Sequence, residues 1–137
     1  FPKTDIAVLS AAVADFRPEM VADQKIKKNP ENDIFTIKLV KTEDILKSVG
    51  KIRTENQTVV GFALETENGL ENAKRKLHTK NIDLIVLNEM NESGVGFKTK
   101  TNKISIITKN DEVTSYELKP KNEVATDILK AIYQYIN

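Results

Sequence analysis

The sequence contains no cysteine, a single histidine and almost no net charge, since 21 lysines and arginines balance 20 aspartates and glutamates to leave a formal charge of +1. Without cysteine, a disulfide framework, a cysteine-based zinc site and a cysteine nucleophile are excluded. The near-neutral balance indicates that the whole chain is not the electrostatic partner of a polyanion, so any basic function must be local. Aromatic residues make up only 6% of the chain and do not interleave with the lysines, so we expect no nucleic-acid partner.

Long apolar runs are absent as well. No stretch approaches the roughly 20 apolar residues that cross a bilayer, and we expect a cytoplasmic protein with no membrane partner. The 137 residues are 39% hydrophobic and 30% charged, which is typical of one globular domain with a real core. The chain starts at Phe1 without Met and enters a strand almost at once, so we expect residues 1–137 to be a single domain that lacks its amino-terminal βα segment.

Apolar runs of strand length alternate with helical patterns along much of the chain. Residues 6–13 form a continuous apolar run, which predicts a strand buried on both faces of a parallel sheet. Residues 58–63 and 82–87 predict two more buried strands, with a helix between them that starts at a Thr66 cap and runs to about Lys80. Strand, helix and strand joined by short links form a βαβ unit, which implies parallel strands and a right-handed crossover.

The segment between the first two of these strands is highly charged. Residues 15–31 contain two prolines and no stable period, which predicts a long loop, and residues 35–40 predict a further strand. Thr42 is placed to cap a helix whose first turn holds Glu43 and Asp44, where acidic side chains favour the helix dipole.

The pattern changes towards the carboxyl terminus. Gly94-Val95-Gly96 lies in a polar loop and is not a dinucleotide fingerprint, because no strand-to-helix turn with a third glycine follows it. Residues 103–108 and 112–118 alternate around a turn, which predicts an antiparallel hairpin, and residues 124–136 predict an amphipathic terminal helix. The whole pattern predicts an α/β fold with a mainly parallel sheet and a carboxyl-terminal antiparallel hairpin.

Three polar or aromatic residues lie near the carboxyl ends of the predicted strands, namely Asp15, Phe62 and Asn88. Ligands of open parallel sheets bind beyond these ends, so the sequence predicts a site there. Asp15 is followed by a cluster of lysines at positions 25, 27 and 28. One carboxylate followed by a mobile basic segment suits an anionic, metal-bound ligand, whereas the alternative is a solvated loop face.

The helix predicted over residues 66–80 places Lys76 and Lys80 on one edge, beside its core face. Lysines on helix edges are commonly only solvated, yet two on one edge could meet a triphosphate together. His78 lies on the flank of the same helix among lysines, and no partner set supports a catalytic or metal-binding role. The residues alone leave open an enzyme, a non-catalytic nucleotide-binding or regulatory module, and, least favoured, a nucleic-acid binder.

Several separated motifs occur in an order that resembles the bacterial phosphopantothenoylcysteine synthetases, the phosphopantothenate–cysteine ligases of coenzyme A biosynthesis. These motifs are AAVADFRP, the following KIKK, VGFALET and AKRKLHTKNIDLIVLN. The resemblance implies a Rossmann-like three-layer α/β/α fold and a ligation that depends on CTP. In that reaction the carboxylate of 4′-phosphopantothenate attacks the α-phosphate of CTP, pyrophosphate leaves, and the amine of L-cysteine then displaces CMP from the acyl-cytidylate.

The resemblance also implies roles for individual residues. Lys25, the first lysine of KIKK, corresponds to the loop lysine that acts on the cytidylate intermediate, and Phe62 of VGFALET corresponds to the residue beside the cytosine. Ala11 lies on the strand that borders the nucleotide, while Asp15 is expected near Mg²⁺. Mg²⁺ prefers oxygen ligands and would bridge the phosphates.

Two further motifs are implied to contact the nucleotide. Lys76 and Lys80 match the pair that binds the triphosphate. Asp44 and Ile45 match the end of an Asn-Pro-Asp-Ile turn, but Thr42 and Glu43 replace its first two residues. This departure weakens a side-chain role for these two residues but leaves a backbone role possible.

Partners are implied by the same resemblance. The family forms homodimers, and the alternating hairpin is assigned to the interface; fusion to, or a complex with, the phosphopantothenoylcysteine decarboxylase is common. The glycine-rich amino-terminal segment of the family, which contributes to the phosphopantothenate pocket, precedes the position of Phe1. We therefore expect these 137 residues alone to bind CTP weakly and not to turn over.

Overall fold

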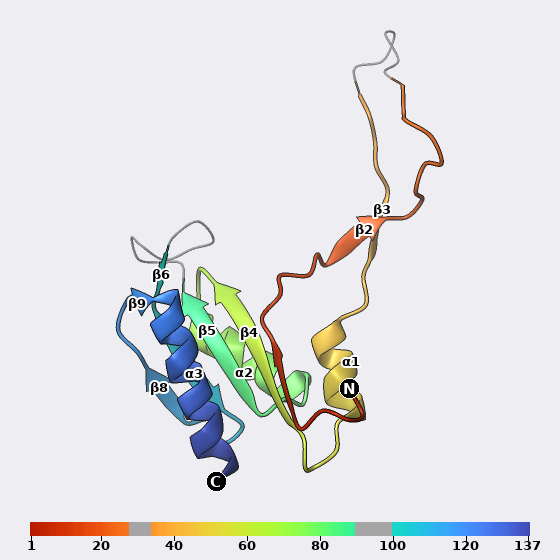
Figure 1. Cartoon of the computed structure of the whole chain (residues 1–137). Helices are drawn as coiled ribbons and strands as arrows, with labels where there is room; N and C mark the ends of the chain where they lie inside the picture. The colour runs from red at the N-terminus through yellow and green to blue at the C-terminus, as the bar shows by residue number, and fades with distance from the viewer. Residues whose placement is uncertain (28–33, 90–99) are drawn as a thin grey trace. The chain divides into compact units, whose positions relative to one another are not determined.

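The computed structural model describes residues 1–27, 34–89 and 100–137 and divides the chain into two compact units. Residues Phe1–Ser10 and Ile45–Asn137 form one unit, which we call the sheet unit. Residues Ala11–Asp44 form the other, which we call the arm (Figure 1). The predicted glycine-containing loop and Lys28 lie outside the described residues.

The sheet unit is built on a five-stranded mixed sheet with the strand order β1-β4-β5-β7-β8. Its strands are β1 (Ile6–Leu9), β4 (Thr58–Glu65), β5 (Leu84–Glu89), β7 (Ile104–Thr108) and β8 (Val113–Ser115). The pairs β1–β4 and β4–β5 are parallel, and the pairs β5–β7 and β7–β8 are antiparallel. The predicted parallel βαβ unit and the predicted hairpin are therefore confirmed, and the hairpin extends one edge of the same sheet.

Helices cover both faces of this sheet, which confirms the three-layer α/β fold (Figure 1). Helices α1 (Ile45–Ile52) and α2 (Gly69–Thr79) pack on one face, where Leu46, Ala73 and Leu77 meet buried side chains of β4 and β5. Helix α3 (Lys121–Ile136) packs on the other face through buried residues spaced four apart, Val124, Ile128 and Ile132. This spacing is the apolar stripe of an amphipathic helix.

A short pairing of strands precedes α3. Strand β6 (Thr101–Asn102) lies antiparallel to β9 (Lys119–Pro120). Lys119 Nζ lies 2.7 Å from the Asp127 carboxylate, and this hydrogen bond raises the pKa of the lysine. The contact ties the second turn of α3 to strand β9. None of the helices described in this structure is long and apolar enough to cross a membrane.

A buried carboxylate joins four elements at the amino-terminal ends of the parallel strands. Asp83 is 3% exposed, and its carboxylate lies 2.6 Å from the Arg53 guanidinium. The same carboxylate accepts the backbone N–H of Val59 at 2.8 Å and the Tyr135 hydroxyl at 3.4 Å. Burial, followed by the negative charge of Asp83, raises the pKa of Tyr135. The segments after α1 and before β5 are thus tied to β4 and α3.

The first strand is shorter and more exposed than the apolar run of residues 6–13 predicts. Strand β1 ends at Leu9, and Ile6 and Val8 are 41% and 44% exposed. Leu9 packs on the face covered by α1 and α2, whereas the alternating side chains of Ile6 and Val8 point to the other face. The prediction of burial on both faces is wrong because β1 lies at the end of the described strand order, beyond the strands β4, β5 and β7 whose side chains pack with α3.

The arm contains a short antiparallel ribbon where a loop was predicted. Strand β2 (Phe16–Pro18) pairs with β3 (Leu39–Lys41), so the predicted loop over residues 15–31 starts with a strand and the predicted strand over residues 35–40 is confined to its end. Pro18 fits this ribbon because an edge position needs no N–H donor there. Large apolar side chains of the arm are exposed, namely Val13, Phe16, Met20, Val21, Ile26, Ile34, Phe35, Ile37 and Leu39.

Neither threonine caps a helix as predicted. Helix α1 begins at Ile45, after Glu43 and Asp44, and the Thr42 hydroxyl donates to the Ala14 carbonyl at 2.5 Å within the arm. Helix α2 begins at Gly69 and is preceded by Asn68 with φ of 50°, a left-handed conformation that asparagine tolerates. In both places the helix begins three residues after the threonine, at Ile45 and at Gly69.

Gly50 is the position where the packing of α1 leaves least space. A Cβ atom there would lie 1.8 Å from the backbone oxygen of Lys80. The Asn81 amide also donates to the Gly50 carbonyl at 2.9 Å, which fixes α1 against the end of α2. In an unhindered helix, replacement of glycine by alanine would stabilise the protein by about 1 kcal/mol. Here the backbone contact reverses that sign.

We predict that Gly50→Ala lowers the free energy of unfolding by at least about 2 kcal/mol, because the added methyl group must push two backbones apart. Gly61→Ala is the matched control, since its Cβ would meet only the mobile ends of Leu46 and Ile82 at 2.6 and 2.8 Å. Urea unfolding of both variants measures the difference. A Gly50→Ala protein as stable as the wild type would show that α1 and α2 are not in this contact.

Candidate functional site

The carboxyl ends of β4 and β5 lie together at one edge of the sheet unit. Leu64 pairs with Asn88 and Glu65 pairs with Glu89 in the parallel register, and Phe62 lies two residue pairs before the pair that contains Asn88. Two of the residues predicted to mark a site, Phe62 and Asn88, are therefore brought to the same edge. The Oδ1 atom of Asn88 is buried and has no hydrogen-bond partner among the described residues.

Phe62 is half-buried on the face of the sheet that α3 covers. One part of its ring packs with the cluster around Val60 and Ile128, and the rest remains accessible. An aromatic side chain that is held by packing and partly exposed offers a flat apolar surface. Any nucleobase can stack on such a surface, because every base has a flat π-face. The position of Phe62 is thus compatible with the role beside a base that the resemblance implies.

Lys76 reaches back from α2 to the end of β4. Its ammonium lies 2.5 Å from Oε1 of Glu65, while Asn72 donates its side-chain amide to Oε2 of the same carboxylate at 3.1 Å. The Lys76 side chain is 37% exposed and that of Glu65 only 14%. Lysine side chains on a helix lean towards its amino terminus, so Lys76 delivers its charge to the carboxyl edge although its backbone lies further along α2.

Sequence reasoning missed Glu65. The signal was present, because this carboxylate ends the strand that precedes the lysine-bearing helix, and a βα unit folds the first turns of the helix back over the strand end. An acid at such a strand end and a lysine two turns into the following helix are brought into contact by that geometry alone.

Lys80 lies one helical turn beyond Lys76 and forms the C-cap of α2. Its backbone N–H donates to the Lys76 carbonyl at 3.0 Å, and its backbone oxygen faces Gly50 of α1. Lys76 and Lys80 do share one edge of the helix, but only Lys76 is shown with its ammonium at the end of β4. A shared contact of the two lysines with one triphosphate stays a prediction.

The other predicted site residues belong to the arm or to its junction with α1. Ala11, Asp15, Lys25 and Asp44 are exposed residues of the arm, and Ile45 is the first residue of α1. Within the arm, the Asp15 carbonyl accepts the Thr42 N–H at 2.9 Å, which extends the β2–β3 ribbon and leaves the Asp15 carboxylate exposed. The roles of these residues in binding and catalysis stay predictions.

The chemistry of Asp15 fits the predicted magnesium contact. No group of three or more acidic or histidine side chains that could hold a metal occurs among residues 1–27, 34–89 and 100–137. Mg²⁺ is often held by one or two carboxylates together with the phosphates of a nucleotide. A single exposed carboxylate such as Asp15 could supply the protein's share of that coordination.

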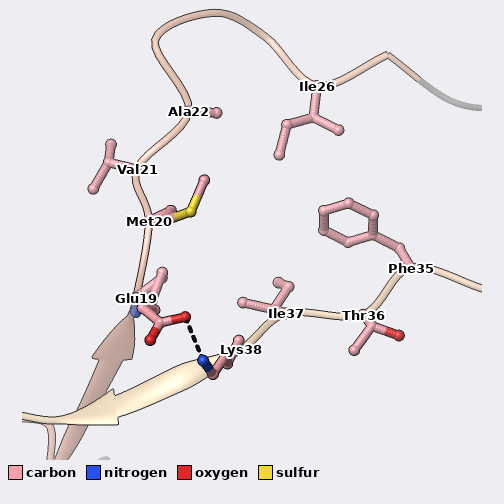
Figure 2. A pocket seen from close by; sticks show the side chains of 10 residues that line it. Glu19, Met20, Val21, Ala22, Ile26, Phe35, Thr36, Ile37 and Lys38 are labelled. Carbon is pink, nitrogen blue, oxygen red and sulfur yellow. Dashed lines mark ion pairs between the residues drawn. The ribbon is translucent and has the colours of Figure 1, made fainter.

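The arm encloses a hollow of about 500 Å³ between its two halves (Figure 2). Figure 2 shows Met20, Ile26 and Phe35 directed into this space, with the ion pair between Glu19 and Lys38 at 2.9 Å near the ribbon. The lining is mainly apolar, so the hollow does not resemble a phosphate-binding site. It is better suited to apolar side chains.

The chain is similar to a known family, to curated relatives and to a solved structure. Residues 1–136 match the family described as the DNA/pantothenate metabolism flavoprotein (DFP) C-terminal domain. Among curated relatives, a cysteine/cysteine sulfinic acid decarboxylase from an unknown prokaryotic organism is 46% identical over all 137 residues, which cover 38% of that protein. The coenzyme A biosynthesis bifunctional protein CoaBC of Borreliella burgdorferi is 42% identical over 134 residues, or 97% of this chain and 33% of the relative.

A solved structure gives the third comparison. The crystal structure of the C-terminal domain of a CoaBC protein has a TM-score of 0.73 and 35% sequence identity, with 96% of this chain and 54% of that chain covered. The chain thus spans about a third of the length of the curated relatives described above and about half of the solved domain.

Proposed function

The chain belongs to the DNA/pantothenate metabolism flavoprotein C-terminal domain family, and from this membership we propose that it forms part of a phosphopantothenate–cysteine ligase that acts in cytoplasmic coenzyme A biosynthesis. The observation that carries the proposal is the match to CoaBC proteins, including a solved C-terminal domain, by a chain that retains the lysine and strand-end motifs. The decarboxylase name of another relative belongs to a protein of which this chain covers 38%. Because CoaBC is named a bifunctional protein, we further propose that this chain is fused to, or acts in a complex with, the phosphopantothenoylcysteine decarboxylase.

The proposed reaction first activates the carboxylate of 4′-phosphopantothenate with CTP and then replaces the cytidylate by the amine of L-cysteine. The carboxylate of 4′-phosphopantothenate attacks the α-phosphorus of CTP, and the bond to pyrophosphate breaks to leave an acyl-cytidylate. The amine of L-cysteine then attacks the acyl carbon, CMP leaves and an amide remains. Because the first step brings two anions together, it needs positive charge positioned near the phosphoryl oxygens.

The residues of this chain can supply that charge. The Lys76 ammonium lies at the carboxyl end of β4, the strand that carries Phe62 three residues before its end, and in the proposal Lys76 binds the triphosphate together with Lys80 while Phe62 packs beside the cytosine. Asp15 would contribute a carboxylate to Mg²⁺, which offsets the phosphate charge when bound. Ala11, Asp44 and Ile45 would border the nucleotide, and Lys25 would act on the acyl-cytidylate.

Lys25→Gln in the full-length enzyme tests the assignment of the second half-reaction. We predict that pyrophosphate is still released from CTP in the presence of 4′-phosphopantothenate, whereas formation of the amide falls by roughly 100-fold or more, as expected when a charged catalytic group is lost. Lys27→Gln is the matched control, because it removes an equally exposed lysine two residues away and should leave both half-reactions intact. Equal loss of both half-reactions in Lys25→Gln would instead make this lysine a general binding residue.

A homodimer is the second part of the proposal, and the exposed apolar residues of the arm support it. Met20, Val21 and Phe35 are 83%, 84% and 63% exposed, and such a concentration of apolar surface commonly marks an interface. The hairpin, expected from the sequence to contribute, presents the exposed edge strand β8, with Val113 42% exposed.

We predict that light scattering gives twice the protomer mass for the wild type and that Phe35→Ser shifts the equilibrium towards the monomer. Val113→Ser makes the same kind of change on the hairpin and should leave the mass unchanged if the arm provides the contact. A monomeric wild type would contradict the dimer, and dissociation by Val113→Ser alone would assign the interface to the hairpin.

A further inference from the structure

The carboxylate of Glu65 is held by both of its oxygens. Glu65 is the last residue of β4, and its Oε1 atom receives Lys76 while its Oε2 atom receives Asn72. The Asn72 amide also donates to the Glu67 carbonyl at 3.1 Å, and its oxygen accepts a hydrogen bond from Arg75 at 2.8 Å. The acid is therefore fixed between the end of the strand and the first turns of α2.

We propose that Glu65 is a positioning residue for nucleotide binding, which holds the Lys76 ammonium at the carboxyl edge in the orientation that receives the β- and γ-phosphates of the nucleotide. This inference rests on the proposed function, because it takes a nucleoside triphosphate as the ligand of this edge. The inference goes beyond the proposed function because it assigns the acidic residue Glu65 a role in binding an anionic nucleotide.

The flexibility of the lysine side chain gives such a role a physical basis. Lysine has a flexible stem and loses much rotamer freedom when it is fixed on a ligand. If Glu65 fixes the stem beforehand, that entropic cost does not fall on nucleotide binding. The ammonium has three N–H donors, so the contact with Glu65 leaves donors for phosphate oxygens, and the side chain is 37% exposed and accessible to them.

Two other interpretations of the pair make different predictions. If the ion pair between Glu65 and Lys76 only supports the turn between β4 and α2, its loss would weaken the binding of CTP and of CMP by the same factor. If Glu65 competes with the phosphates for Lys76, removal of its negative charge would tighten the binding of CTP. Positioning alone predicts weaker binding of CTP despite the loss of a nearby negative charge, with no change for CMP, which lacks the β- and γ-phosphates.

The test is calorimetric titration of the full-length enzyme with CTP and with CMP, in wild type, in Glu65→Gln, Glu67→Gln and Lys76→Met, and in the double variant that combines Lys76→Met with Glu65→Gln. We expect Glu65→Gln to raise the dissociation constant of CTP about fivefold to tenfold, which corresponds to the cost of ordering one long side chain. The dissociation constant of CMP should stay within about twofold of the wild-type value. Glu67→Gln removes the same charge from an exposed residue two positions along and should match the wild type for both nucleotides. The double variant should bind CTP with the same affinity as Lys76→Met alone, because Glu65 acts only through Lys76.

A second variant keeps the test independent of the charge change. Asn72→Ala leaves the ion pair in place but removes the hydrogen bond to the other carboxylate oxygen, and it should weaken CTP by a smaller factor while sparing CMP. Unchanged or tighter binding of CTP by Glu65→Gln, or equal loss of CTP and CMP, would overturn the positioning role. Failure of the wild type to bind CTP would instead refute the proposed function itself, and this inference with it.

Discussion

The sheet unit depends on one buried charge. Asp83 enters the interior at the start of β5, where an unpaired carboxylate would be strongly destabilising, so Arg53, the Val59 N–H and Tyr135 must all converge on it. These partners come from the end of α1, from β4 and from α3. Their convergence fixes the amino ends of the parallel strands, and the register then places Phe62, Glu65 and Asn88 at the opposite edge. The groups proposed to meet the nucleotide are thus positioned by a contact at the far end of the same strands.

The two units contribute different chemistry to the proposed ligase. The sheet unit supplies a rigid edge with an aromatic ring, a fixed acid and a lysine whose charge is already oriented. The arm supplies an exposed carboxylate, Asp15, and an exposed lysine, Lys25, and it carries much exposed apolar surface. Rigid elements are suited to recognition of the nucleotide, whereas a basic segment is suited to act on the activated intermediate. The further role for Glu65 follows from the same division, because a positioning acid is useful only on a rigid edge.

Periodicity in the sequence was sufficient for the parts of the fold in which burial decides the structure. It predicted β4, β5, α2, the hairpin and α3, and four short motifs predicted the family that the match over residues 1–136 confirms. It failed where tertiary neighbours decide. The apolar side chains of Ile6 and Val8 predicted core positions, but β1 is an edge strand and both are exposed. Thr42 was predicted to cap a helix, but its hydroxyl donates a hydrogen bond to the Ala14 carbonyl within the arm. Glu65 lies within the motif VGFALET, but it was missed because only Phe62 of that motif was given a role and its contact with Lys76 forms only when α2 packs beside β4.

The most direct test of the account is calorimetry of the full-length enzyme with CTP, ATP and single-stranded DNA in the presence of Mg²⁺. The proposed ligase should bind CTP at least about tenfold more tightly than ATP, since a site that pairs its polar groups with one base discriminates against another. It should not bind the DNA. Equal affinity for CTP and ATP would contradict the assignment to cytidine, and binding of DNA alone would contradict the ligase.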